Sequence, residues 1–379
     1  MASASAAGEA SRHQVVTWGA SADRLGQAVG DRSYRLVVRT SLGGSQPRVR
    51  LSNAFGDRPV TFGKVYAGKR EEGARLVPGS NRRITFGGAR SVTVAPGDSV
   101  TSDPLPGRLA AQSDLVVSLY VAEAAGQATG HGMAMQTSYA TGGDHAGEEG
   151  EGSWSERIGS WFYLDAVSVE SAADTGAVVA LGDSITDGWQ STTDTNRRWP
   201  DYLSRRLQGA SMTGVKGVAN EGISGNKVLA DGAGQSALAR LQRDVLSQPG
   251  VRTVFLFEGI NDIKAHTGVT SAQLIDGYRQ IIDRAHAAGK CVVGGTVLPF
   301  KGWSEFDAAG EAVRQEVNDF IRSSGELDAV ADFDKALRSP YDRERLLPAL
   351  DGGDHLHPND KGMRVMADAV DPADLECDR

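Results

Sequence analysis

The second half of the chain alternates short apolar runs with helical segments. From Gly176 onward, the runs AVVAL, VKGVAN, VRTVFLF, KCVVGGTVL and DAVADF are separated by segments such as RWPDYLSRRLQ and SAQLIDGYRQIIDRAHAAG. Strands that alternate with helices in this way form a parallel sheet with helices on both faces. We therefore expect an α/β domain, in which chemistry collects at the carboxyl ends of the strands.

The first half has a different pattern. From about His13 to Val169 the chain consists of alternating or β-branched runs between turn signals, for example YRLVVRTSL and SDLVVSLYV. This pattern predicts an all-β sandwich or jelly-roll-like domain. A chain of 379 residues is also longer than one core usually supports. We expect a disordered lead-in at 1–12, an accessory β domain at 13–172 and a catalytic domain at 173–379.

One strand end carries a serine that could be a nucleophile. The run from Val178 continues as VVALGDSITDGW and places Ser184 directly after the strand. Gly, Asp and Ser together often mean only a turn. A catalytic serine also requires a base, a group that orients the base, and donors for an oxyanion.

The segment DGGDHLHPND supplies a base and its partner. His357 precedes Pro358, so we expect its imidazole on a loop that enters the last helix. Asp354 is three residues earlier, a spacing that allows its carboxylate to hold one ring nitrogen while the other faces Ser184. His355 and Asp351 offer a competing pair, which the spacing disfavours because His355 adjoins Asp354.

Three groups could donate to an oxyanion. They are the backbone N–H of Ser184, the backbone N–H of Gly222 and the side-chain amide of Asn261, each of which follows a predicted strand. Possible substrate-binding residues near these positions are Asp183, Trp189 and Trp303. For either tryptophan, packing in the core is an equally good explanation.

These segments, taken in order, resemble the four sequence blocks of the SGNH, or GDSL, hydrolases. The blocks are GDSIT, NEGISG, GIND and the DHLHP segment, and they span Gly182 to His357. The resemblance implies a three-layer, flavodoxin-like parallel sheet, with Ser184 as nucleophile and His357 and Asp354 as base and orienter. It also implies Gly222 and Asn261 as oxyanion donors. The amino-acid sequence around the blocks is similar to that of the arylesterase/acylhydrolase subgroup, which includes xylan-degrading esterases.

Several other functions are disfavoured. The chain has a formal net charge of -8 and no long run of basic residues, so we expect no nucleic-acid partner. No apolar run approaches the length of a membrane span. DGGDHLH could be a metal site, but a serine site needs no metal, and we expect neither a metal nor a cofactor.

The cysteines and the amino terminus bear on location. Cys291 opens an apolar run and, with Cys377, gives too few cysteines for a disulfide framework. We therefore expect Cys291 to be a buried, inert thiol. We expect a secreted protein whose signal has been trimmed, with a cytoplasmic location as the alternative.

The expected function is that of a serine esterase acting through an acyl-enzyme on short-chain, acetyl-type esters of carbohydrates or other polar alcohols. The substrate would be a small molecule or a polysaccharide. One alternative is a lipase or acylhydrolase of longer-chain esters. The other is a carbohydrate-binding protein with secondary hydrolase activity.

Overall fold

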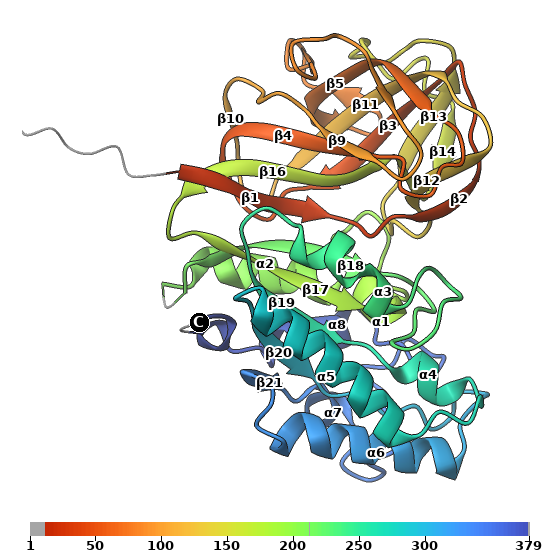
Figure 1. Ribbon diagram of the computed structural model, residues 1–379, viewed down its shortest axis with the longest axis vertical. Helices are drawn as coiled ribbons and strands as arrows, with labels where there is room; N and C mark the ends of the chain where they lie inside the picture. Colours follow the sequence, from red (N-terminus) through yellow and green to blue (C-terminus); the bar gives the residue numbers. More distant parts are fainter. Residues whose placement is uncertain (1–11, 212, 378–379) are drawn as a thin grey trace, which may run out of the picture.

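The computed structural model describes residues 12–211 and 213–377. The lead-in expected at 1–12 lies outside these residues, except for Arg12, which begins the first strand. Figure 1 shows a strand-rich half (residues 12–172, the β half) stacked on a mixed half (residues 176–377, the α/β half).

The β half is built from antiparallel strands in three sheets. The strands are β1 (Arg12–Gly19), β2 (Asp23–Gln27), β3 (Arg32–Arg39), β4 (Gly44–Ser52), β5 (Val60–Glu72), β6 (Arg75–Leu76), β7 (Arg82–Arg83), β8 (Val92–Val94), β9 (Ser99–Thr101), β10 (Arg108–Leu109), β11 (Asp114–Glu123), β12 (Gln127–His131), β13 (Ser138–Gly142), β14 (Glu156–Ile158), β15 (Trp161–Phe162) and β16 (Leu164–Ala172).

Two of these sheets enclose a core. One has the order β1-β16-β4-β10, and the other has the order β14-β13-β3-β11-β5-β6. Val49 and Val167 from the first sheet join Leu36, Phe62 and Val117 from the second in one buried cluster. The expected all-β sandwich is confirmed, and its likeness to a jelly roll stays a prediction.

The α/β half has a parallel sheet of order β18-β17-β19-β20-β21, which is the flavodoxin-like order 2-1-3-4-5. Its strands are β17 (Gly176–Gly182), β18 (Val215–Gly222), β19 (Val251–Phe257), β20 (Cys291–Gly295) and β21 (Ala329–Ala331). The helices are α1 (Ser184–Asp187), α2 (Trp199–Gly209), α3 (Ala237–Arg240), the π-helix η1 (Leu241–Leu246), α4 (Ile260–Lys264), α5 (Ser271–Ala287), α6 (Ala308–Ser323), α7 (Phe333–Leu337), α8 (Asp360–Asp368) and the 3-10 helix η2 (Pro372–Leu375).

Both faces of this sheet are covered by helices. Along β17, Val179 and Leu181 point into a cluster that contains residues of α5 and α6. Val178 and Ala180 point to the opposite face, where α2 and α8 pack. Because successive side chains of a strand face opposite sides, an unbroken apolar run is what a strand covered on both faces requires. The predicted three-layer fold is confirmed.

Besides the core that each half encloses, the two halves share one buried cluster. Val15 and Val16 of β1 lie in the same buried cluster as Val179 and Ala219 of the parallel sheet. The backbone N–H of Val16 also donates to the carbonyl of Pro249 at 2.8 Å. β1 therefore belongs to a sheet of the β half while it covers the edge of the other sheet (Figure 1).

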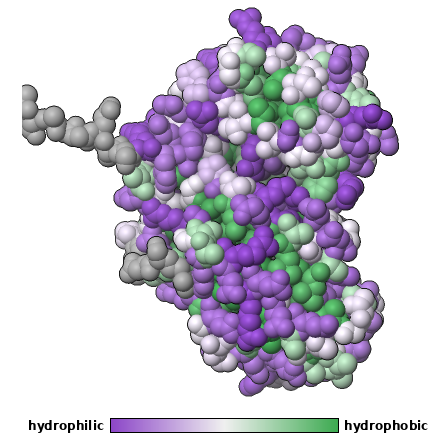
Figure 2. Space-filling view, in the orientation of Figure 1, coloured by the Kyte–Doolittle hydropathy of each residue, from purple (hydrophilic) through white to green (hydrophobic). Residues whose placement is uncertain are grey.

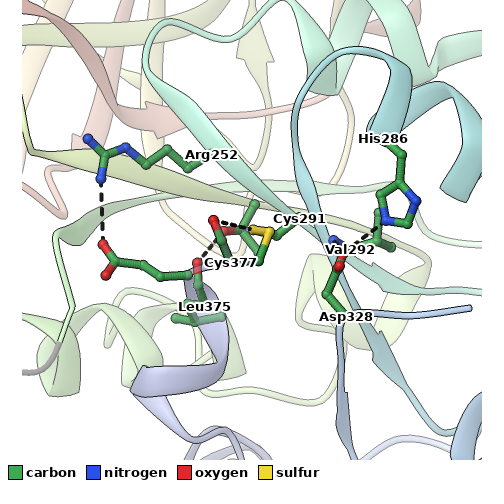
Figure 3. Close-up of a disulfide and its surroundings, with 9 residues drawn as sticks. Arg252, His286, Cys291, Val292, Asp328, Leu375 and Cys377 are labelled. Carbon is green, nitrogen blue, oxygen red and sulfur yellow. Dashed lines mark hydrogen bonds and ion pairs between the residues drawn. A yellow bond between two sulfur atoms is a disulfide. The ribbon is translucent and has the colours of Figure 1, made fainter. Parts of the chain in front are cut away.

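The expectation for the cysteines is wrong. Cys291 forms a disulfide with Cys377, 86 residues later in the chain. The bond joins the start of β20 to the segment after η2, beside the Arg252–Glu376 ion pair (Figure 3). Two cysteines suffice for one structural cross-link, even though they are too few for a framework.

Removing this disulfide should destabilise the protein without changing its chemistry. A cross-link that closes so long a loop contributes about 2–4 kcal/mol to the free energy of unfolding, or roughly 2–5 °C in the unfolding midpoint of a chain of 379 residues. Thermal unfolding of Cys377→Ser beside the wild type would measure the loss. Turnover per folded molecule should not change, because the bond lies at the amino end of a strand. If dithiothreitol did not lower the unfolding midpoint of the wild type, this prediction would be contradicted.

The helices of the described residues bury their apolar faces inside the molecule. None of them is long and apolar enough to cross a lipid bilayer. Figure 2 shows a mostly hydrophilic face with smaller hydrophobic groups in both halves.

Candidate active site

Ser184 lies where β17 turns into α1. Asp183 is the N-cap of this helix, and its carboxylate accepts the Ile185 N–H at 2.9 Å. Gly182 permits the turn, because a Cβ there would lie 2.2 Å from the Thr186 hydroxyl. The apolar run therefore ends in a tight turn that holds the serine at the carboxyl edge of the sheet.

The predicted serine, histidine and aspartate are brought together. The Ser184 hydroxyl lies 2.7 Å from His357 Nε2, and His357 Nδ1 lies 2.7 Å from an Asp354 oxygen. The other Asp354 oxygen accepts the backbone N–H groups of Leu356 and His357 at 3.0 and 2.9 Å. The carboxylate thus fixes both the loop and the ring, a geometry in which His357 can take the serine proton.

Burial and hydrogen bonds tune these groups. Burial lowers the pKa of His357 below its usual value, and the Asp354 carboxylate offsets this only in part. Burial acts to raise the pKa of Asp354, but the hydrogen bonds from His357 and Leu356 outweigh it, so the pKa lies below its usual value. Near neutral pH the pair therefore consists of a neutral imidazole and a carboxylate.

His355 and Asp351 form a pair of the same length at a different place. His355 Nδ1 lies 2.7 Å from an Asp351 oxygen, but its side chain is 49% exposed, compared with 7% for His357. The backbone φ of His355 is 69°, in the left-handed region. α8 begins at Asp360, so Pro358 precedes the helix instead of occupying its first turn.

A pocket of about 360 Å³ opens beside the serine and histidine. Ser184, Trp189, Asn261, Trp303 and His357 line it, together with five residues that were not among the predicted site residues. These further residues are Met133, Ser224, Gly225, Lys264 and Leu356. Trp303 packs edge-on against the His357 ring, with 5.9 Å between centroids.

The structure does not support Gly222 as an oxyanion donor. Its N–H donates to the Asn220 side chain at 3.0 Å, and the residue packs against Asp187 at the end of α1 instead of lining the pocket. Gly225, three residues later and with φ of 83°, lines the pocket instead. The Asn261 amide donates one hydrogen to the Asn226 carbonyl at 2.8 Å, which leaves its second N–H for a ligand.

Asp183, a predicted substrate-binding residue, is not among the residues that line the pocket. It is 2% exposed and is used as the cap of α1. Burial raises the pKa of this carboxyl to about 7. Among the described residues, no group of three or more His, Cys, Asp or Glu side chains could hold a metal ion.

The sequence of this region matches a known family. Residues 180–365 match the model of the GDSL-like lipase/acylhydrolase family. They form a GDSL-like lipase/acylhydrolase domain. The protein is accordingly a hydrolase that acts on ester bonds. No curated protein sequence matches the chain.

The solved structures that are similar to this chain include the following three. A putative lipolytic protein of the G-D-S-L family from Desulfitobacterium hafniense is 21% identical, with a TM-score of 0.41, and the match covers 52% of this chain and 97% of that one. A carbohydrate acetylesterase from Sinorhizobium meliloti is 17% identical, with a TM-score of 0.40 and coverage of 52% and 96%. An acetylxylan esterase from Geobacillus stearothermophilus is 23% identical, with a TM-score of 0.40 and coverage of 52% and 94%.

Proposed function

We propose that the protein is a serine esterase that removes short acyl groups, of the acetyl type, from carbohydrates or other polar alcohols. The observation that carries the proposal is the unbroken chain of short contacts from Ser184 through His357 to Asp354, at the wall of a pocket. A serine hydroxyl is a weak nucleophile until a base beside it takes its proton.

In the first half of the reaction, Ser184 Oγ attacks the ester carbonyl carbon while His357 Nε2 takes the hydroxyl proton. Asp354 stabilises the imidazolium that forms. The N–H groups of Ser184 and Gly225 and the Asn261 amide hold the negative charge on the carbonyl oxygen. The tetrahedral intermediate collapses, and the departing alcohol oxygen receives the proton from His357.

In the second half, water attacks the acyl-enzyme and gives a proton to His357. The new tetrahedral intermediate expels the Ser184 oxygen, which recovers its proton from His357. The products are the free acid and the original enzyme. The step uses only groups of this chain and water.

The shape of the pocket supports a small acyl group. Its volume of about 360 Å³ is at the lower end of the usual range for ligand sites, roughly 300–1,000 Å³. Trp189, which is 46% exposed, stands at its wall. An exposed indole offers an apolar face and an N–H donor, a combination suited to a ligand that is partly apolar and partly polar.

Substrate length tests the proposal directly. Across p-nitrophenyl esters from acetate to dodecanoate, we expect kcat/KM to be highest for the shortest acyl groups and to fall as methylenes exceed the pocket. Acetate release from acetylated xylan would test the alcohol side. If dodecanoate were the best substrate, the lipase alternative would replace this proposal.

The low pKa of His357 sets the acid limb of the pH profile. The base works only when neutral, so kcat/KM should be lost as pH falls through this pKa, which lies below the usual value of about 6.5. Activity should therefore exceed half of its plateau at pH 6.5 and fall about tenfold per pH unit once below the pKa. A limb centred above pH 7 in the free enzyme would contradict the assignment.

We also propose that the protein is exported. The disulfide between Cys291 and Cys377 supports this location, because structural disulfides persist mainly in oxidising compartments.

A further inference from the structure

The β half reaches into the pocket through one segment. Residues 131–137, here called the strap, join β12 to β13 and place Met133 among the pocket-lining residues. Ser224 Oγ of the α/β half lies 3.2 Å from the Met133 sulfur. The front half of the chain therefore forms part of the wall of a pocket whose nucleophile and base belong to the second half.

The far end of the strap is fixed to the loop between α1 and α2. The Asp194 carboxylate accepts from the Gln136 amide and from the N–H and hydroxyl of Thr137. The Asp194 N–H in turn donates to the Met135 carbonyl at 3.1 Å. This loop also carries Trp189, so the contacts set the strap against another pocket residue.

The near end of the strap is fixed by a buried charge pair. His131 Nδ1 lies 2.9 Å from the Ser21 carbonyl, and Nε2 lies 2.8 Å from an Asp187 oxygen and 3.1 Å from the Met133 carbonyl. Backbone carbonyl and carboxylate oxygens accept hydrogen bonds but do not donate them, so both nitrogens of the His131 ring must carry hydrogen. His131 is therefore an imidazolium that faces the Asp187 carboxylate, and the two side chains are 6% and 5% exposed.

The pair connects to the wall beside the proposed oxyanion site. Asp187 lies on α1, three residues after the nucleophile, and its second oxygen accepts the N–H and the hydroxyl of Ser224 at 3.0 and 2.9 Å. Ser224 precedes Gly225. One continuous set of contacts thus runs from His131 through Asp187 to the backbone of the pocket.

The positions of Met133 and Trp303 indicate which part of an ester each would meet. His357 must return its proton to the alcohol oxygen, so the alcohol lies on the side where Trp303 packs against His357. Met133 instead contacts Ser224, next to Gly225. A thioether at that wall would limit the length of the acyl group.

We propose that the β half completes the ester site: Met133 is the residue that limits acyl length, and His131 is a positioning residue that holds Met133 and Ser224 in place. This inference rests on the proposed esterase function. It assigns to the β half a role in substrate specificity, in addition to the packing of its sheets.

The first test varies the size of residue 133. Met133→Ala should raise the ratio of kcat/KM for p-nitrophenyl octanoate over acetate by about tenfold or more, since a few methylenes gain space. Met133→Leu, which keeps the volume, should stay within about threefold of the wild-type ratio. An unchanged ratio in Met133→Ala, or an equal loss for all esters, would overturn the role of Met133.

The second test separates positioning from folding. In His131→Ala, active sites are counted by stoichiometric p-nitrophenolate release from a serine-directed p-nitrophenyl phosphonate. We expect His131→Ala to have a higher KM for p-nitrophenyl acetate. Its octanoate-to-acetate ratio of kcat/KM, per titrated site, should rise as much as in Met133→Ala. The double variant should show little further rise in this ratio. His131→Gln, which keeps one N–H donor, should recover part of the wild-type ratio.

A purely structural His131 would lower the number of titrated sites and leave the ratio per site unchanged, which would overturn its positioning role. If His131→Ala does not fold, Asp194→Ala releases the exposed end of the strap and must shift the ratio in the same direction. A wild-type enzyme that the phosphonate does not label would refute the serine mechanism itself. A labelled enzyme whose ratio never moves would refute only the role of the strap.

Discussion

Replacing Ser184 by alanine should reduce kcat/KM for p-nitrophenyl acetate by roughly 10⁴- to 10⁶-fold. The change removes the hydroxyl oxygen that lies 2.7 Å from His357 Nε2 and that would attack the ester. The oxyanion donors and the pocket remain, so a small residual rate over water is expected. Steady-state kinetics on purified protein, with active-site labelling by a phosphonate, would measure the loss.

The loss should not come from unfolding. Ser184→Ala deletes one hydroxyl from a side chain already held in a capped turn, so the unfolding midpoint should stay close to that of the wild type. Ser323→Ala, which changes an exposed serine at the end of α6, is the matched control and should keep full activity. Comparable turnover in Ser184→Ala and the wild type would refute the serine mechanism.

The second large effect distinguishes two neighbouring histidines. His357→Ala should cost nearly as much as Ser184→Ala, and the double variant little more, because the two side chains act as one unit. Asp354→Ala should be milder, since it keeps the nucleophile and the base and removes only the carboxylate that orients the His357 ring. His355→Ala should stay within about threefold of wild type, because its ring is half exposed and pairs with Asp351.

The comparison of kcat/KM for the two histidine variants decides the base. The variants are matched, because each deletes an imidazole that is 2.7 Å from a carboxylate on the same loop. If His355→Ala were the inactive variant, His357 would not be the base, although a serine mechanism could still hold.

The α/β fold was predictable because local pattern and burial agree along it. The run around Val178 is apolar at every position, which a strand between two helical layers requires. The helices from Ser271 and from Ala308 follow from apolar spacing and from caps at Thr270 and Asp307. The shared core was not predictable, because nothing in β1 indicates which sheet its apolar side chains will meet.

Within the site, the pairing of residues close in sequence was predictable, whereas the backbone conformation that selects an oxyanion donor was not. Asp354 and His357 are three residues apart, so their pairing is a local matter. Gly222 and Gly225 lie in the same sequence block, and only the conformation separates them. The N–H of Gly222 is used inside the end of β18, whereas Gly225 lies past the strand with a positive φ.

No pattern in the sequence indicated the contacts between distant segments. His131 and Asp187 are 56 residues apart and come from different halves. Cys291 and Cys377 pair across 86 residues. Neither pairing follows from periodicity, because each depends on how the completed sheets stack.

The core that β1 shares with the parallel sheet restricts how such a protein can evolve. Val15 and Val16 bury their side chains against residues that belong to the hydrolase sheet. A gene fragment cut after Ala172 would separate partners in one apolar cluster, so each fragment would expose apolar side chains that the whole chain buries. Substitutions at Val15 or Val16 must therefore remain compatible with the packing of the hydrolase sheet.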